Sequence, residues 1–303
     1  MERAGWDVFY VTDKRGAQFM KKETTYVMSP APFFGKNIFK KILSLYGFFK
    51  ETAKMYKLLN KRFDFLFGTG GYVCFPGFFA SILRRIPFFI LEENVLAGRT
   101  TRIFKRFSKK TFYGLGEKSI GNPVRKEIEN ASLENPSLIL VIGGSQGAKR
   151  LNELAFEIAE RFKNIRVVLI KGKWEIPKRR PMKNLEIIRF TDAPWSIYKK
   201  TKIAIARAGA MTISELLCMG IPTIFIPFPY AVDNHQYYNA LFVYENNAGF
   251  LVEEKELFKV FDIIEELLTN ERKWKTIRKN ALSLAKKNSS LEIIKEIKKC
   301  LEE

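Results

Sequence analysis

Histidine and cysteine are scarce in this chain, and their scarcity excludes several kinds of site. The 303 residues include one His and three Cys. Cys74, Cys218 and Cys300 show neither metal-binding nor redox spacing, so we expect reduced cytosolic thiols rather than a disulfide framework. The single histidine, His235, is expected to be structural, because a lone His is more often structural than catalytic.

Long uninterrupted apolar runs are also missing. The uncharged stretch over residues 65–83 contains four glycines and one proline, which is typical of a strand followed by a glycine loop rather than a membrane span. Residues 1–11 do not have the apolar core of a signal peptide. We therefore expect a protein that is soluble or bound at a membrane surface.

Positive charge, in contrast, is in excess. Lys and Arg number 52 against 32 acidic residues, which gives a net charge of +20 at pH 7. Nucleic acid, an anionic membrane surface and phosphate-bearing substrates all attract such a charge. The basic residues are spread over many expected helices, and no nucleic-acid-binding signature is present. A membrane surface and a pyrophosphate substrate therefore rank above nucleic acid as partners.

Length and pattern predict an α/β fold in two successive domains. A chain of 303 residues suits two domains, and 47% hydrophobic residues is a globular composition. We expect a first domain over residues 1–125, a linker over 126–136 and a second domain over 137–287. A last helix over residues 288–303 is expected to pack back toward the first domain.

A helix is expected over residues 36–59, because apolar residues recur there every three or four positions. Phe33, Phe34 and Phe48 exceed what one core stripe requires. Six lysines accompany them: Lys36, Lys40, Lys41, Lys50, Lys54 and Lys57. The pattern fits an amphipathic helix with solvated lysines, or an apolar patch with a basic rim that rests on anionic lipid.

In the second half, a buried strand over residues 138–142 leads through a glycine turn, residues 143–148, into a helix over 152–162. This order of strand, glycine turn and helix is the context in which a backbone cradle for phosphate forms. The turn is not the strict dinucleotide fingerprint, and the lysine of a P-loop is missing. Neither NAD nor ATP chemistry is indicated, and we expect no cofactor.

A second turn of this kind lies within residues 202–240. A strand containing Ile203 and Ile205 is followed by small residues, and a helix opened by Thr212 to Glu215 ends at Gly220. Free backbone N–H groups and the helix dipole favour an anion at such a helix start. Glu215, expected in the first turn, could accept from a ribose diol. An ordinary βαβ unit, with Glu215 as a favourable first-turn charge, explains the same residues equally well.

Three loops in the first half follow or join predicted strands. A glycine cluster, residues 68–71, follows the strand over 63–67, and residues 92–98 follow the strand over 87–91. Residues 121–125 end the first domain. Glycines after a strand allow close approach of a ligand to the backbone, but they also make tight turns.

Five segments, taken together and in their order, resemble the MurG family of N-acetylglucosaminyltransferases, which belongs to glycosyltransferase family 28. They extend over nearly the whole chain. The segments are Gly68-Thr69-Gly70-Gly71-Tyr72-Val73, Glu92-Glu93-Asn94 with Gly98, Gly121-Asn122-Pro123-Val124-Arg125, Gly143-Gly144-Ser145-Gln146-Gly147-Ala148, and Ala208-Gly209-Ala210-Met211-Thr212-Ile213-Ser214-Glu215 with Asp233-Asn234-His235-Gln236-Tyr237-Tyr238-Asn239-Ala240.

The resemblance implies a GT-B fold, in which two Rossmann-like domains face each other across a cleft. It implies inverting transfer of N-acetylglucosamine from UDP-GlcNAc to undecaprenyl-pyrophosphoryl-N-acetylmuramyl-pentapeptide, the step from lipid I to lipid II in peptidoglycan synthesis. No metal or other cofactor is implied. The enzyme would be peripheral at the cytoplasmic face of the cell membrane, next to other proteins of cell-wall synthesis.

The resemblance also implies roles for residues. Ser145 and Arg125 would contact the donor diphosphate, Glu215 the ribose hydroxyls and Gln236 the sugar hydroxyls. Thr191 would lie near the uracil, and Asn94 would face the cleft from the acceptor domain. The donor-binding segment as a whole is Ala210, Met211, Thr212, Ile213, Ser214 and Glu215, with the backbone N–H groups of Ala210 to Thr212 on the phosphate. The acceptor-side candidates are Gly70, Gly71, Tyr72 and Glu93.

One family motif is absent. MurG proteins begin with a strand and a Gly-Gly-Thr-Gly-Gly-His loop, whereas this sequence begins past it, so the general base is not identified and a start upstream of Met1 is expected. Two alternatives to the transferase remain. One is a non-catalytic protein that binds a nucleotide sugar, and the other is a GT-B transferase that forms glycolipids.

Overall fold

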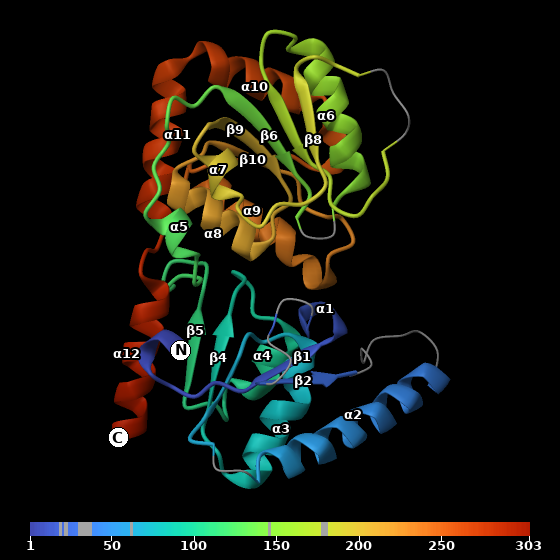
Figure 1. The fold of residues 1–303 in the computed structure, drawn as a ribbon, viewed down its shortest axis with the longest axis vertical. Helices are drawn as coiled ribbons and strands as arrows, with labels where there is room; N and C mark the ends of the chain where they lie inside the picture. The colour runs from blue at the N-terminus through green and yellow to red at the C-terminus, as the bar shows by residue number, and fades with distance from the viewer. Residues whose placement is uncertain (18–19, 21–23, 30–37, 61–62, 145–146, 177–180) are drawn as a thin grey trace. The chain divides into compact units, whose positions relative to one another are not determined.

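The chain folds into two units, each built from parallel strands and the helices that cover them (Figure 1). The computed structural model describes all residues except 18–19, 21–23, 30–37, 61–62, 145–146 and 177–180. Unit 1 contains residues 1–93, 97–113 and 291–303. Unit 2 contains residues 94–96 and 114–290.

Unit 2 is organised around a parallel six-stranded sheet. Its strands are β6 (Leu138–Ile142), β7 (Val167–Ile170), β8 (Leu185–Ile188), β9 (Thr201–Ala206), β10 (Thr223–Phe225) and β11 (Phe250–Leu251). They lie in the order β11-β10-β9-β6-β7-β8. Runs of Val, Ile and Leu form the central strands, because both faces of a parallel sheet are covered and exclude water. The chain runs outward from β6 through β7 to β8 and then returns to place β9 on the other side of β6, so a topological switch point lies between β6 and β9.

Alternate residues of β6 enter two separate cores, one on each face of the sheet. Leu138, Leu140 and Ile142 pack with side chains of α8 and α9, whereas Ile139 and Val141 pack with side chains of α6 and α10. The helices of unit 2 are α5 (Lys126–Glu129), α6 (Lys149–Arg161), α7 (Trp195–Tyr198), α8 (Ala210–Met219), α9 (His235–Glu245), α10 (Lys259–Thr269) and α11 (Glu271–Leu284), with 3-10 turns at Val232–Asn234 and Glu254–Glu256.

Unit 1 contains a two-stranded and a three-stranded parallel sheet among its described residues. The first pairs β1 (Tyr10–Asp13) with β2 (Thr25–Met28), and the second has the order β3-β4-β5, formed by Leu66–Gly68, Phe88–Glu92 and Lys110–Tyr113. The helices are α1 (Lys14–Ala17), α2 (Ile38–Leu58), α3 (Phe75–Arg84), α4 (Arg99–Phe104) and α12 (Ser289–Glu302), with 3-10 turns at Glu2–Ala4 and Tyr72–Cys74. Aromatic rings fill the core between α3, α4 and β4.

Phe48 belongs to the core of unit 1, although the helical pattern predicts that it exceeds one core stripe. Only 7% of its surface is exposed, and its ring lies 5.0 Å from that of Phe75 in an edge-to-face contact. Phe33 and Phe34 lie outside the described residues.

Two segments are assigned to a unit by contacts with residues distant in sequence. Residues 114–125 pack within unit 2, where Val124 enters the core and the Asn122 amide donates to Ser214 Oγ at 3.0 Å. Residues 291–303 belong to unit 1, where Glu296 accepts from Lys110 at 2.5 Å. The contact of Asn122 with Ser214 leaves no mark in composition or periodicity.

Within the described part of the chain, no helix has the length and apolar character that crossing a membrane requires.

Candidate active site

Strands β6 and β9 end side by side at the switch point of unit 2. The Arg207 N–H, directly after β9, donates to the carbonyl of Ile142, the last residue of β6, at 3.2 Å. Each strand continues through a short segment that contains glycine into a helix, β6 into α6 and β9 into α8 (Figure 1). Ligands of doubly wound sheets bind at this point, outside the carboxyl ends of the strands. The two glycine turns singled out in the sequence thus lie at one place.

The amino end of α8 presents backbone N–H groups. Gly209 caps the helix with an extended backbone and offers no side chain, and the first intrahelical bond runs from the Ile213 N–H to the Gly209 carbonyl. The N–H groups of Ala210, Met211 and Thr212 precede that bond and point out of the helix end. They supply the dipole and the donors that an anion requires.

The turn after β6 depends on glycine at two positions for different reasons. Gly147 has φ +76°, and a Cβ there would lie 2.3 Å from the carbonyl oxygen of Lys171. Gly144 has φ +77°, and no atom of the described residues lies within 4 Å of where its Cβ would be. Ser145 lies outside the described residues, so its contact to a diphosphate stays a prediction.

Glu215 occupies the second turn of α8, not the first as expected, because the helix begins at Ala210 rather than at Thr212. Its Oε2 accepts from the Tyr198 hydroxyl at 3.0 Å. Burial raises the pKa of Glu215, while the Tyr198 hydroxyl and the charge of Arg125 act in the opposite direction. Glu215 therefore does not cap the helix, and its carboxylate is held by a side chain from α7.

Arg125 and Tyr198 complete the group around Glu215. Arg125 directly precedes α5 and is exposed, and its positive charge lowers the pKa of both Glu215 and Tyr198. Burial is the larger effect on Tyr198, and it raises the pKa of that phenol well above its usual value. Two residues predicted for the donor site, Arg125 and Glu215, are thus brought together from positions 90 apart in the sequence, 125 and 215.

The side chains of Ile213 and Ser214 point into the core of unit 2 rather than toward a ligand. Ile213 is fully buried in the core, and Ser214 Oγ donates to the Ala210 carbonyl at 2.9 Å while accepting from Asn122. Ala210 is 6% exposed, and Met211 and Thr212 are half-buried. A contact from residues 210–214 to an anion therefore has to come from the backbone of the first turn and the exposed parts of Met211 and Thr212.

Comparison with known proteins identifies the family. Residues 1–113 match the glycosyltransferase family 28 N-terminal domain, and residues 138–297 match the glycosyltransferase family 28 C-terminal domain. The chain is 32% identical to the UDP-N-acetylglucosamine--N-acetylmuramyl-(pentapeptide) pyrophosphoryl-undecaprenol N-acetylglucosamine transferase of Sulfurihydrogenibium sp. (strain YO3AOP1), with 100% of this chain and 90% of that relative covered. The chain belongs to glycosyltransferase family 28.

Further similarities agree with this assignment. The Aquifex aeolicus (strain VF5) protein of the same description is 32% identical, with 90% of this chain and 87% of that protein covered. The crystal structure of Acinetobacter baumannii MurG is similar with a TM-score of 0.76 and 25% identity, covering 98% of this chain and 92% of that one. The predicted resemblance to the MurG family and the predicted α/β fold of the GT-B class are confirmed.

Gln236 and Thr191 both accept hydrogen bonds from backbone N–H groups of the chain. They are two more residues predicted to bind the donor of this family 28 chain. Gln236 Oε1 accepts from the Phe228 N–H at 2.9 Å, which leaves its NH₂ group to donate elsewhere. Thr191 Oγ1 accepts from the Ala193 N–H at 3.1 Å within its own loop. His235 Nδ1 contacts the Val232 carbonyl at 2.5 Å in the turn before α9. The contacts of Gln236 and Thr191 to sugar and uracil stay predictions.

Asn94 belongs to unit 2, where it contacts Asn239, a residue to which the sequence analysis gave no role. The Asn239 side chain is fully buried and donates to Asn94 Oδ1 at 2.9 Å and to the Ala208 carbonyl at 3.2 Å. Its own oxygen accepts from the Val95 N–H at 2.9 Å. A clue was available, since Asn239 lies beside Ala240 and Val243 on the buried stripe of α9, where a polar side chain needs partners.

The structural role of Arg207 was also not evident from the sequence. Its side chain is buried and donates to the carbonyls of Ile226 and Pro227 at 3.1 and 3.0 Å. It also forms an ion pair with Glu254. Arg207 thereby connects the turn after β9 to the segment after β10.

The acceptor-side candidates follow two neighbouring strands of unit 1. Gly70, Gly71 and Tyr72 come after β3, and Glu93 comes directly after β4. The Tyr72 hydroxyl donates to Asp13 at 3.3 Å, and burial, with a smaller effect of the Glu92 charge, raises the pKa of Glu93. These residues gather at the carboxyl edge of a parallel sheet in unit 1, as the donor candidates do in unit 2.

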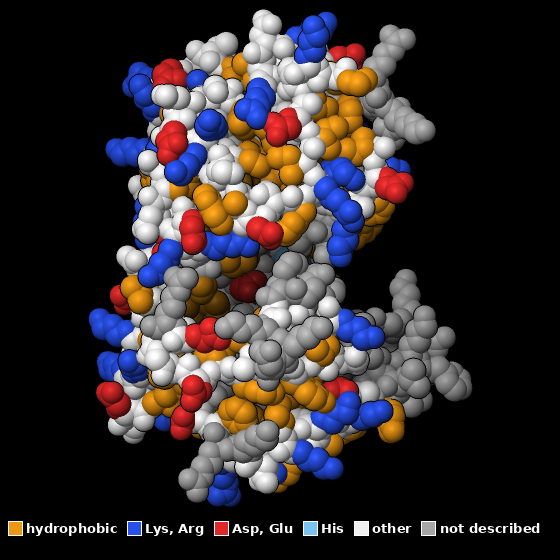
Figure 2. Space-filling model, viewed as in Figure 1, with side chains coloured by type: hydrophobic (Ala, Val, Ile, Leu, Met, Phe, Trp, Pro, Cys, Tyr) orange, Lys and Arg blue, Asp and Glu red, His pale blue; other side chains and the backbone are white. Residues whose placement is uncertain are grey.

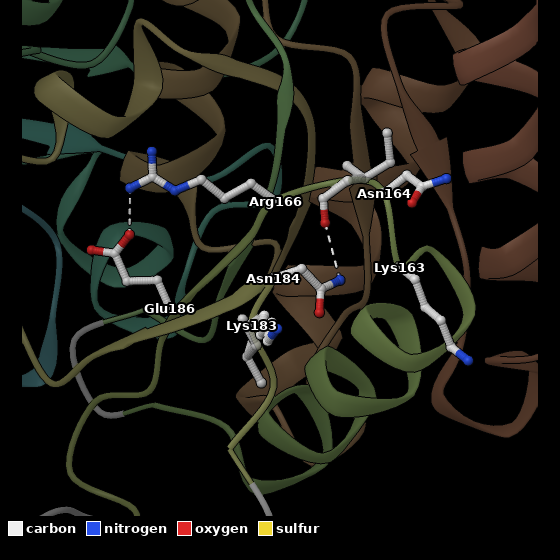
Figure 3. A pocket seen from close by; sticks show the side chains of 8 residues that line it. Lys163, Asn164, Arg166, Lys183, Asn184 and Glu186 are labelled. Carbon is white, nitrogen blue, oxygen red and sulfur yellow. Dashed lines mark hydrogen bonds and ion pairs between the residues drawn. The ribbon is translucent and has the colours of Figure 1, made fainter.

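A cavity of about 310 Å³ in unit 2 lies away from this site (Figure 3). Residues 163–166 and 183–186 line it, at the amino ends of β7 and β8. Figure 3 shows the Asn184 amide directed at the Ile165 carbonyl, and the same amide also donates to the carbonyls of Ala159 and Phe162. This amide therefore braces the loop after α6. Across the described residues, no three His, Cys, Asp or Glu side chains are grouped to hold a metal ion.

Proposed function

We propose that this chain transfers N-acetylglucosamine from UDP-GlcNAc to the lipid-linked N-acetylmuramyl-pentapeptide pyrophosphate, the reaction named for its family 28 relatives. The observation that carries the proposal is the switch point of unit 2, where the amino end of α8 and the Arg125–Glu215 group lie beside the glycine turn after β6. The N–H donors and the cation suit the diphosphate of a sugar nucleotide, and the carboxylate suits its ribose hydroxyls. The descriptions of the two relatives named above favour this function over the glycolipid-forming alternative.

The chemistry follows from where charge develops. When the acceptor hydroxyl displaces the diphosphate at the anomeric carbon, negative charge grows on the departing phosphate oxygens. The N–H groups of Ala210, Met211 and Thr212 are fixed by the helix and need no reorganisation as that charge appears. Together with the guanidinium of Arg125 they stabilise the transition state more than the bound donor, which is what accelerates the step.

We further assign the donor ribose to Glu215 and the donor sugar to Gln236. Glu215 lies one turn after the anion-binding end of α8. The ribose likewise follows the diphosphate along a nucleotide. Gln236 has its NH₂ group left for a sugar hydroxyl. The acceptor is assigned to unit 1, at Gly70, Gly71, Tyr72 and Glu93.

We also propose that unit 1 binds the anionic cytoplasmic surface of the cell membrane, where the lipid acceptor resides. Tyr46, Phe49 and Tyr56 on α2 are 68%, 56% and 37% exposed. Lys50, Lys54 and Lys57 lie on the same helix. Exposed aromatic rings with lysines between them are the composition of a helix that rests in a lipid headgroup layer. Other proteins of cell-wall synthesis are proposed partners there.

Turnover by purified variants tests the proposed function. Glu215→Ala and Ser145→Ala are expected to abolish release of UDP from UDP-GlcNAc in the presence of lipid acceptor, with the melting temperature unchanged. Glu253→Ala is the control, since the Glu253 side chain is 45% exposed and, among the described residues, forms an ion pair with Lys255 at 3.3 Å. Full activity in both site variants would refute the assignment of the donor site. Donor binding without turnover by the unaltered chain would instead favour the non-catalytic nucleotide-sugar-binding protein.

A further inference from the structure

Tyr198 and Glu215 form a hydrogen-bonded pair that joins two elements of unit 2. Tyr198 ends α7 and is 1% exposed, and Glu215 lies in α8, on the far side of β9 in sequence. The Tyr198 hydroxyl donates to Glu215 Oε2 at 3.0 Å. A buried phenol contributes ring packing wherever it lies, but its hydroxyl here is directed at one oxygen of one carboxylate.

This bond fixes the plane of the carboxylate. A glutamate side chain on a helix has three rotatable bonds, and burying it in one rotamer costs conformational entropy. Because Oε2 is engaged by Tyr198, Oε1 is presented in one direction. A ribose diol needs such an acceptor at a fixed position, since two adjacent hydroxyls on a rigid ring define where the carboxylate must be.

We propose that Tyr198 is a positioning residue for the donor nucleotide: its hydroxyl holds the Glu215 carboxylate in the orientation that accepts the ribose hydroxyls. The proposal rests on the proposed function, in which Glu215 binds the ribose. Tyr198 itself lies behind Glu215 and does not touch the substrate.

The groups around Glu215 determine how this positioning responds to pH. From α7 the Tyr198 hydroxyl stabilises the charged carboxylate, and so does Arg125 from the start of α5. On α8 itself, Cys218 has a pKa raised to about 11 by burial, with the charges of Glu129 and Glu215 adding to the rise and Lys287 opposing it, so the thiol stays neutral at physiological pH. Without the Tyr198 hydroxyl, the pKa of Glu215 rises further, and the carboxylate is lost at a higher pH.

Calorimetric titration of the purified chain with two probes, UDP and 2′,3′-dideoxy-UDP, separates positioning from simple packing. In Tyr198→Phe we expect the Kd of UDP to rise about tenfold, while the Kd of the dideoxy compound, which has no ribose hydroxyls to place, stays unchanged. The acid limb of UDP binding is expected to move to higher pH. Tyr244→Phe is the matched control, because Tyr244 is 53% exposed on α9; it should alter neither probe.

The outcomes distinguish the two proposals. Equal weakening of UDP and dideoxy-UDP by Tyr198→Phe, or an unshifted acid limb, means that Tyr198 only packs, and it overturns the inference while the proposed function stands. Equal affinity of the unaltered chain for the two probes removes the ribose contact of Glu215 itself. Should Tyr198→Phe fail to fold, Tyr198→Met, which fills similar space without a hydroxyl, takes its place with the same expected results.

Discussion

In unit 2, the contacts of individual polar side chains explain why each position requires its residue type. Asn239 uses both ends of its amide on three different partners, and Arg207 uses its guanidinium on two carbonyls and a carboxylate. Glu215 is the exception, since burial opposes its charge and only Tyr198 and Arg125 favour it. A buried carboxylate with a raised pKa is typical of a residue kept for binding rather than for stability.

Glu215→Gln is therefore expected to leave the folded state equally stable or more stable at neutral pH. The pKa of Glu215 is raised in the folded state, so the folded protein binds its proton more readily than the unfolded chain does, and stability falls as pH rises through that window. The neutral amide removes this loss and can still accept from Tyr198. Urea unfolding at about pH 7 and at about pH 5 measures the effect. A clear loss of stability at neutral pH in this variant would contradict the direction of the shift.

Removing the acidic partner of Arg207 should lower the stability of the fold, in contrast to the substitution of Glu215. Arg207 has a side chain only 9% exposed, so removing Glu254 leaves a buried guanidinium without its counter-charge. We expect Glu254→Ala to destabilise the fold by about 3 kcal/mol in urea unfolding. Glu253→Ala, next in sequence, removes only a surface pair with Lys255 and should cost less than about 0.5 kcal/mol. Similar values for both variants would show that the buried pair adds nothing.

At the scale of elements, the site depends on where two helices begin. Both α6 and α8 start directly after glycine turns at the ends of adjacent strands, and neither has a side-chain cap. An uncapped helix start is a cost to the free protein, because its first N–H groups lack acceptors. The same absence leaves those groups to a ligand, and it follows from the cap residues, Ala148 and Gly209, which have no side chain that could accept from them.

Two glycines in the turn after β6 give a matched test of this turn. Gly147→Ala forces both a left-handed backbone at φ +76° and a contact of 2.3 Å with the Lys171 carbonyl, and we expect a loss of about 3 kcal/mol in stability and of measurable donor binding. Gly144→Ala has the same left-handed backbone but open space around its Cβ, so we expect a loss of about 1 kcal/mol. Thermal unfolding of both variants compares them. Equal destabilisation would mean that the close approach is relieved by movement of the loop.

Elements with strong local patterns could be predicted from the sequence, and contacts between them could not. The apolar strand and the glycine turn over residues 138–148 were evident, because burial on both faces and close backbone approach each require particular residue types. The start of α8 was placed at Thr212, two residues late, because Ala210 and Met211 carry no capping signal. The pairing of Tyr198 with Glu215 was not foreseen, since it depends on how α7 and α8 pack around β9.

At the scale of the whole molecule, the net charge of +20 is spread rather than concentrated. Figure 2 shows Lys and Arg side chains scattered over the visible face of each unit, with acidic and apolar side chains between them. Scattered charge attracts an anionic surface from a distance without defining where the contact forms. The exposed aromatic side chains of α2 are what would localise it.

Vesicle sedimentation tests whether the net charge attracts the chain to the membrane and the aromatic side chains of α2 form the contact. We expect binding to vesicles with anionic lipid, weaker binding as salt is raised, and little binding to zwitterionic vesicles. Lys50→Gln should lower partitioning about fivefold, and Phe49→Ser should lower it at any salt concentration. Tyr244→Ser, an exposed aromatic of unit 2, is the control. Binding unaffected by Phe49→Ser would place the lipid contact elsewhere.

The path of the chain through the two units has a consequence for biosynthesis. Unit 1 is assembled from residues at both extremes of the sequence, since Ile293 and Ile297 of α12 are buried and Lys298 lies over the ring of Trp6. A nascent chain that has released residues 1–113 from the ribosome therefore still lacks part of that unit, while the whole 114–290 segment has yet to be translated. Residues 1–113 must therefore wait for α12 before unit 1 is complete, and during that interval a chaperone can bind the side chains that α12 later covers.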